Sequence, residues 1–393
     1  MNNGTVMKSW HLLFRLGQRS AWRQWLFISL LGTVALKTSA AEVDGRTKAL
    51  MHTFVVEFAK MSPYLASDSA FTSEKGKTTV TESINTLVKK AGPPPSELNQ
   101  SPGFRITYGL LTDHLQKTQQ ALSNGEMEYA RMRVNGIGNL CAACHMQAPK
   151  ISHFSAFEFV AERGKEASLP NAEFLFVIRR YDEALSLFDK LAREFPKNGL
   201  SVDQLSEVYR RKLGIFARVY RDPVQAIENL NLDLKNSKLP PTIRQSIDSW
   251  IAALGKWKSE ASDPSRLKTP ALLSFVNKSL PSDVTRKIGP GHPQLLDILR
   301  LSGLLYERLY KEPGGEFAQE LLYTLSRCER SLSPLYWYSI SEIYLKECIV
   351  QYRKKPFSKK CYDAYSEGML ERYSGKPIPE GVQQSIDALK DYL

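Results

Sequence analysis

Residues 115–145 read LQKTQQALSNGEMEYARMRVNGIGNLCAACH, and the fold class follows from the pattern of this stretch. Its second half places apolar residues at spacings of 3, 4, 3 and 4, which is one face of an α-helix. These residues are Met127, Ala130, Val134, Ile137 and Cys141. Asn124-Gly125 separates this helix from the one before it, because Asn and Gly readily adopt the left-handed turn that ends a helix. So short a connection predicts an antiparallel helix pair.

The residues before this pair continue the helical pattern. Apolar residues at the same spacings predict a helix over 43–65, and Met51 lies on its apolar face. Periodic stretches over 80–91 and 104–122 predict two more helices. Four amphipathic helices within about 105 residues predict an antiparallel four-helix bundle, which we place at 42–150.

The chain beyond residue 150 predicts a second helical region. After a linker over 151–170, five residues have the spacing of the second half of a tetratricopeptide repeat. They are Tyr181, Ala184, Phe188, Leu191 and Pro196. Two further helical pairs are predicted over 291–332 and 333–373, whereas 256–290 is rich in Pro, Ser and Lys and is predicted to be irregular. We therefore expect an all-α chain with an α-solenoid over 171–393, an architecture that serves as a binding surface more often than as a catalyst.

The first 41 residues predict an export signal. The chain has 393 residues and a formal net charge of +12, and residues 1–41 carry five cations without Asp or Glu. An apolar run from Trp25 to Leu36 follows the cations and ends in small residues at 39–41, the order of a secretory signal peptide. The run has about 12 residues, fewer than the roughly 20 that span a bilayer. We expect cleavage after Ala40 or Ala41 and a bacterial periplasmic location; an uncleaved N-terminal anchor with periplasmic domains is the alternative.

The motif with specific chemistry is Cys141-Ala142-Ala143-Cys144-His145. Cys-x-x-Cys-His is the attachment signal of haem c, in which two thiols bond the porphyrin and the His ligates iron. A redox Cys-x-x-Cys would need a βαβ context, and a zinc site would need a second ligand pair at suitable spacing. The sequence has neither. We expect one covalent haem c on Cys141 and Cys144, with His145 as the proximal iron ligand.

The stretch Leu115 to His145 resembles the last two helices of the cytochrome c′ family, also called class II c-type cytochromes. The resemblance implies a left-handed four-helix bundle with the attachment motif near the end of the fourth helix. It covers 42–150, under a third of the chain. Two features depart from the family: Met146-Gln147-Ala148-Pro149 follows the His where the family usually has a basic or aromatic residue, and the repeat region is foreign to it.

The resemblance also implies that the distal iron ligand comes from the first helix. Met51 lies near where low-spin members of the family place a Met, but Met also packs well in cores. His114, on the apolar face of the third helix, is the second candidate for the distal ligand, and His153 is the third. An open sixth position, which would allow NO or CO to bind, remains an alternative.

Outside the motif the sequence has three cysteines: Cys328, Cys348 and Cys361. Helices over 336–353 and from about Ser358, joined by a turn at 355–357, would bring Cys348 opposite Cys361. An exported compartment preserves disulfides, so we predict this bridge and expect Cys328 to lie away from it. The same turn carries a basic loop, made of residues 353–355 and 359–360, which is predicted to be a solvated hairpin tip; a docking patch is the alternative.

Together these patterns predict an exported monohaem c-type cytochrome that acts in periplasmic electron transfer and is not an enzyme. Its repeat region would dock a periplasmic redox protein or a membrane complex, and no nucleic-acid motif is present. Two alternatives remain. One is a five-coordinate haem protein that senses or scavenges NO or CO, and the other is a structural adaptor whose domain the haem stabilises.

Overall fold

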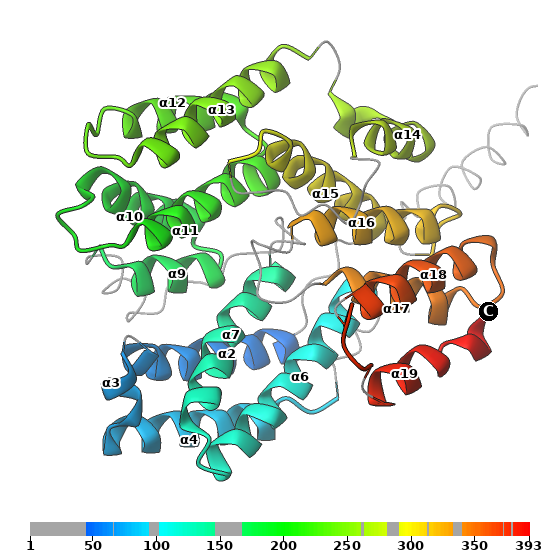
Figure 1. Cartoon of the computed structure of the whole chain (residues 1–393), viewed down its shortest axis with the longest axis horizontal. Helices are drawn as coiled ribbons and strands as arrows, with labels where there is room; N and C mark the ends of the chain where they lie inside the picture. The colour runs from blue at the N-terminus through cyan, green and yellow to red at the C-terminus, as the bar shows by residue number, and fades with distance from the viewer. Residues whose placement is uncertain are drawn as a thin grey trace, which may run out of the picture. The chain divides into compact units, whose positions relative to one another are not determined.

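The computed structural model describes residues 45–65, 67–93, 102–145, 167–260, 263–280, 291–312, 314–332, 340–371, 373–378 and 380–393. The part of the chain from Gly45 to Leu393 forms one compact unit. Within the described ranges it consists of helices and turns without a strand, which confirms the all-α prediction (Figure 1). The predicted signal at 1–41 lies outside the described residues, and no described helix has the length and apolar character needed to cross a membrane.

The first group of helices matches the four that the sequence predicts. It consists of α2 (Gly45–Met61), α4 (Glu74–Lys90), α6 (Pro102–Ser123) and α7 (Met127–His145). A 3-10 turn, η1 (Ser62–Leu65), and the short helix α3 (Asp68–Thr72) connect α2 to α4 and were not predicted. Each long helix packs against the next, and Gly125 makes the turn between α6 and α7 with a φ of 74°. A left-handed φ favours glycine, which explains the residue at this turn.

The second group begins with α9 (Leu169–Val177), so the last two residues of the predicted linker are helical. It continues with α10 (Tyr181–Glu194), α11 (Val202–Leu213), the π-helical turn η2 (Gly214–Tyr220), α12 (Pro223–Asp233) and α13 (Pro241–Lys258). The repeat-like residues of α10 are buried against α9, as their spacing suggested; they are Tyr181, Ala184, Phe188 and Leu191.

The remaining helices form the C-terminal part of the unit. They are η3 (Pro264–Arg266), α14 (Thr269–Ser279), α15 (Gln294–Lys311), α16 (Ala318–Leu332), α17 (Ser341–Gln351), α18 (Pro356–Glu371), α19 (Glu380–Asp387) and η5 (Lys390–Tyr392). The prediction that 256–290 is irregular is wrong for α14. Pro270 is tolerated in the first turn of that helix, and buried Leu272 and Val276 hold it where it packs on α15 and α16.

Hydrophobic side chains of the described chain fall into two clusters. The smaller cluster lies within α2 to α7, and the larger one is built mainly from α9 to α19. Val55 of α2 and Ala142 of α7 belong to the larger cluster, while Phe58, Leu110 and Cys141 pack against both. The end of α7 that carries the motif is therefore joined to the core of residues 167–393, which we call the repeat region after the prediction made for it.

Buried ion pairs hold the middle of the repeat region together. The Lys212 ammonium is fully buried and pairs with the carboxylates of Asp233 and Asp189, the latter at 2.9 Å. Arg218, in the π-helical turn, pairs with Glu329 of α16 at 2.7 Å, and both side chains are buried. Because an unpartnered buried charge is strongly destabilising, each of these groups requires its partner for folding.

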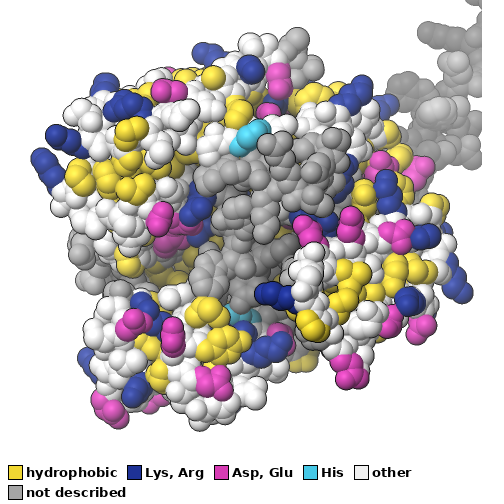
Figure 2. All heavy atoms as spheres, in the orientation of Figure 1, with side chains coloured by type: hydrophobic (Ala, Val, Ile, Leu, Met, Phe, Trp, Pro, Cys, Tyr) yellow, Lys and Arg dark blue, Asp and Glu magenta, His cyan; other side chains and the backbone are white. Residues whose placement is uncertain are grey.

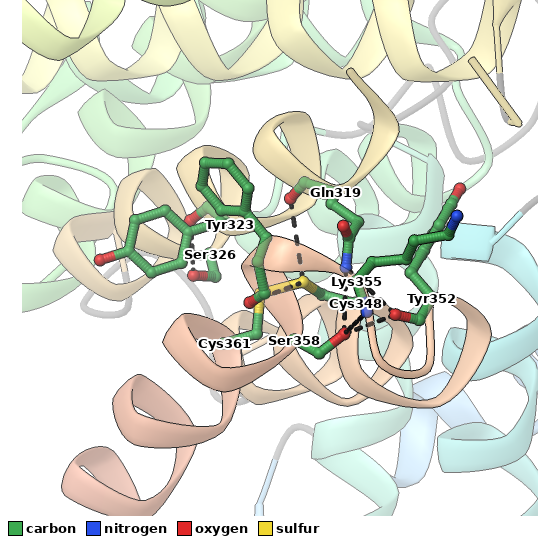
Figure 3. The surroundings of a disulfide bond; sticks show 9 residues. Gln319, Tyr323, Ser326, Cys348, Tyr352, Lys355, Ser358 and Cys361 are labelled. Atoms are coloured by element: carbon green, nitrogen blue, oxygen red, sulfur yellow. Dashed lines mark hydrogen bonds between the residues drawn. A yellow bond between two sulfur atoms is a disulfide. The ribbon is translucent and has the colours of Figure 1, made fainter. Parts of the chain in front are cut away.

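Cys348 and Cys361 form a disulfide, as predicted, with their Cα atoms 6.2 Å apart (Figure 3). The turn differs from the expectation: α17 ends at Gln351 and α18 begins at Pro356, so the connection is 352–355. Cys328 lies on α16, where burial raises the pKa of its thiol to about 12. A buried protonated thiol reacts slowly, because the thiolate is the nucleophile.

Replacing Cys348 and Cys361 with Ser should lower the free energy of unfolding by about 3 kcal/mol, because the bridge restricts the unfolded chain. Urea denaturation of the double variant measures this loss. Non-reducing peptide mapping of the native protein should show Cys348 joined to Cys361, with Cys328 alkylated only after unfolding. A bridge that contains Cys328 would contradict the arrangement.

Candidate functional site

The end of α7 carries the Cys-x-x-Cys-His motif. Cys141 is half-buried and packs against both hydrophobic clusters, and His145 is the last residue of the helix. Cys141 and His145 are four positions apart, so they are neighbours on one helix face. Cys144 is in the helix, but its side chain lies outside the described part of the structure.

His145 is held by the repeat region. Its Nδ1 atom forms a hydrogen bond with the backbone carbonyl oxygen of Val177, at the end of α9. A carbonyl oxygen only accepts, so Nδ1 carries the proton and Nε2 is left as the basic nitrogen. Burial, together with the nearby positive charge of Arg179, lowers the pKa of His145 to about 3. The ring is therefore neutral at neutral pH, which is the form that ligates metals.

Three helices meet around Gly138, about two turns of α7 before His145. An added Cβ at Gly138 would lie 3.2 Å from Phe58 Cζ of α2 and 3.7 Å from Val177 Cγ2 of α9. Phe58 also stacks on Phe174 of α9, with ring centroids 6.2 Å apart and planes 11° apart. Thus α2 and α9 both approach α7 about two turns before His145, and in Figure 1 α9 lies between α7 and α10.

Two contacts join α2 and its following turn to α7. Phe58 lies beside Gly138, and the Arg131 guanidinium donates to the Leu65 carbonyl at 3.2 Å. Both contacts therefore join the second half of α2 and its following turn to the segment of α7 between Arg131 and Gly138. Met51 is half-buried on α2, seven residues before Phe58.

His114 occupies a different place. It is buried on α6, with Nε2 2.6 Å from the Arg133 carbonyl oxygen and Nδ1 3.1 Å from the Arg133 guanidinium. Burial lowers the pKa of His114 to about 4. Arg133 precedes His145 by 12 residues, which is roughly 18 Å along an α-helix. This geometry makes His114 a partnered core histidine and argues against its role as the distal ligand. His153 lies outside the described residues.

Other parts of the described chain offer no comparable site. Its described side chains include no group of three or more His, Cys, Asp and Glu that could hold a metal ion. A recess of about 620 Å³ lies between α12, α13 and α15. Charged side chains that line the recess form ion pairs with each other: Arg300 with Glu260 at 2.7 Å, and Arg221 with Glu307 at 2.7 Å. The recess therefore presents little uncompensated charge to a ligand.

The donor set at the end of α7 fits haem c. The motif supplies two thiols and an imidazole, and the Val177 carbonyl fixes the ring nitrogen that remains for iron. No sequence pattern pointed to Val177 or Arg179, because both lie more than 30 residues beyond the motif and their positions depend on tertiary packing. No family model matches the chain, and comparisons with curated proteins and with solved structures found no match either.

Gly138→Val should lower the free energy of unfolding by about 1–3 kcal/mol, because the added methyl groups meet Phe58 and Val177 in a packed interface. Gly109 of α6 is the matched control, since it is exposed and a Cβ there would meet nothing within 4 Å. Gly109→Val should change stability by about 0.5 kcal/mol or less. Equal effects of the two substitutions in urea denaturation would show that α2 and α9 do not converge on α7.

Proposed function

We propose that this protein is an exported monohaem c-type cytochrome, which transfers single electrons in a bacterial periplasm and uses its helical repeats to dock a partner. One observation supports this proposal above all others. The attachment motif ends α7 with its His held as a neutral imidazole by a backbone carbonyl from another helix. Cys-x-x-Cys-His is the attachment signal of haem c, and a His that ligates a metal commonly donates its other ring N–H to a backbone carbonyl.

The chain's own groups prepare the site in three ways. Cys141 and Cys144 supply the thiols for covalent attachment, and the helix sets their separation. Val177 orients the His145 ring through Nδ1, so that Nε2 is directed by packing rather than free to rotate. Arg179, a buried cation two residues further on, opposes protonation of the ring. Haem c, when bound, supplies an iron that changes reversibly between two oxidation states.

We favour electron transfer over gas binding because α2 carries Met51, the distal ligand that the resemblance implies. Met51 is half-buried, and its thioether is a ligand type that completes six-coordinate, low-spin haem sites. A filled sixth position leaves no site for NO or CO. Because a cytochrome of this kind converts no substrate, the repeat region is assigned to partner binding.

The first prediction of this proposal is one covalent haem for each chain. Protein purified from a periplasm should keep its colour after acid–acetone extraction, and a pyridine haemochrome spectrum should give one haem c per chain. Cys141→Ser with Cys144→Ser should remove the colour, because both thioether bonds are lost. Extractable haem, or none in periplasmic material, would show that the motif has another role.

The second prediction concerns the distal side. Met51→Ala should convert a low-spin spectrum into a high-spin one that changes on addition of CO, because the sixth ligand is removed. His114→Ala is the control. It should leave the spectrum unchanged while lowering the free energy of unfolding by about 1–3 kcal/mol, since it removes a buried ring together with its two hydrogen bonds to Arg133. A wild-type protein that is already high-spin and binds CO would favour the five-coordinate alternative.

A further inference from the structure

The disulfide hairpin carries an excess of positive charge. Residues 348–362 contain five cations and no Asp or Glu; the cations are Arg353, Lys354, Lys355, Lys359 and Lys360. All five are exposed. Over the whole face shown in Figure 2, Lys and Arg side chains are interspersed with Asp and Glu. We call residues 352–360 the basic hairpin.

Most of these charges have no carboxylate partner. Lys359 pairs with Asp363 at 2.9 Å, and the Lys390 ammonium nearby pairs with Asp387 at 2.7 Å. Among the described residues, Arg353, Lys354, Lys355 and Lys360 make no ion pair. Two of them instead cover aromatic rings: Arg353 lies 4.7 Å from the ring centre of Tyr392, and Lys360 lies 4.5 Å from that of Tyr323.

The backbone of the basic hairpin is fixed from several sides. The Lys354 N–H donates to the Tyr392 carbonyl at 3.2 Å, and the Lys355 N–H donates to the Tyr352 carbonyl at 3.2 Å. Gln319 of α16 donates to the Tyr352 carbonyl at 3.3 Å, next to the disulfide that ties α17 to α18 (Figure 3). The side chains of Lys354 and Lys355 are thus displayed on a rigid support.

This arrangement works against the stability of the hairpin. Like charges repel each other, and Lys354 and Lys355 directly precede α18, whose first turn has no acidic residue. Cations near a helix N-terminus oppose the helix dipole. Lys354 also has a φ of 56°, a conformation that costs a non-glycine residue energy. A disulfide and several hydrogen bonds hold the charges in place despite these costs.

We propose that the basic hairpin is a docking surface for an acidic patch on a partner protein. Charge complementarity selects the chemistry of the partner, because unpaired exposed cations steer an anionic surface into contact. A fixed geometry suits a folded partner, since preordered groups lose little freedom on binding. A lipid surface fits less well, because the aromatic rings beside the hairpin are covered by Arg353 and Lys360. The inference rests on the docking role proposed above but does not need the haem.

The test measures how fast the full-length protein associates with a fluorescent glutamate-rich peptide at low salt. Lys354→Gln with Lys355→Gln should slow association about tenfold, whereas the charge-conserving Lys354→Arg with Lys355→Arg should retain it. Lys75→Gln with Lys77→Gln, which removes two exposed cations from α4, is the matched control and should change the rate less than twofold. At about 1 M salt the differences should vanish, because charges are then screened beyond about 3 Å.

Three results would overturn the inference. They are equal slowing by the α4 control, no association of the wild-type protein with the peptide, and binding to vesicles that contain phosphatidylglycerol without binding to the peptide. The haem content of the same samples is measured by the pyridine haemochrome spectrum. If the protein contains haem but does not bind the peptide, only the docking surface is refuted. If it binds the peptide but contains no haem, only the proposal of a cytochrome is refuted.

Discussion

The hydrogen bond between the His145 imidazole and the Val177 carbonyl connects the two helical regions at the point where the chemistry is expected. It determines which ring nitrogen is protonated, and it ties the end of α7 to the end of α9. Around it the two hydrophobic clusters meet, since Cys141 and Phe58 pack against both. A site placed in this way depends on the fold of both regions.

This dependence changes how the resemblance to cytochromes c′ is understood. A chain that ended near residue 150 would keep the motif and the four helices that the resemblance covers. It would lose Val177 and Phe174, and with them the hydrogen bond to His145 and the ring stacked on Phe58. The repeat region therefore supplies part of the surroundings of the motif, in addition to the docking role that we propose for it. Residues 146–149, which depart from the family pattern, lie outside the described residues. Among the described residues, Arg179 places a positive charge near His145.

The sequence predicted those features that local pattern controls. The spacing of apolar residues located α2, α4, α6 and α7, and the turn between α17 and α18 brought Cys348 opposite Cys361 because helical hairpins pair residues at equal distances from the turn. It missed α14, since a segment rich in Pro and Ser can still form a helix when Pro is in the first turn and the apolar residues find a core. The buried Lys212, the π-helical turn and the partners of His114 could not be predicted, because each depends on residues far away in the sequence.

The buried and the exposed cations of the molecule are placed under different constraints. Lys212 and Arg218 are buried cations, and a carboxylate lies beside each of them, because an unpartnered buried charge is strongly destabilising. Exposed cations are under no such requirement, and on most surfaces a mixture of signs is the stable arrangement. The basic hairpin departs from that mixture while a disulfide and a network of hydrogen bonds hold it rigid. Fold stability explains why the interior charges are paired. It does not explain why a rigid support holds unpaired charges at the surface. The negatively charged partner that we propose would explain both the support and the charges.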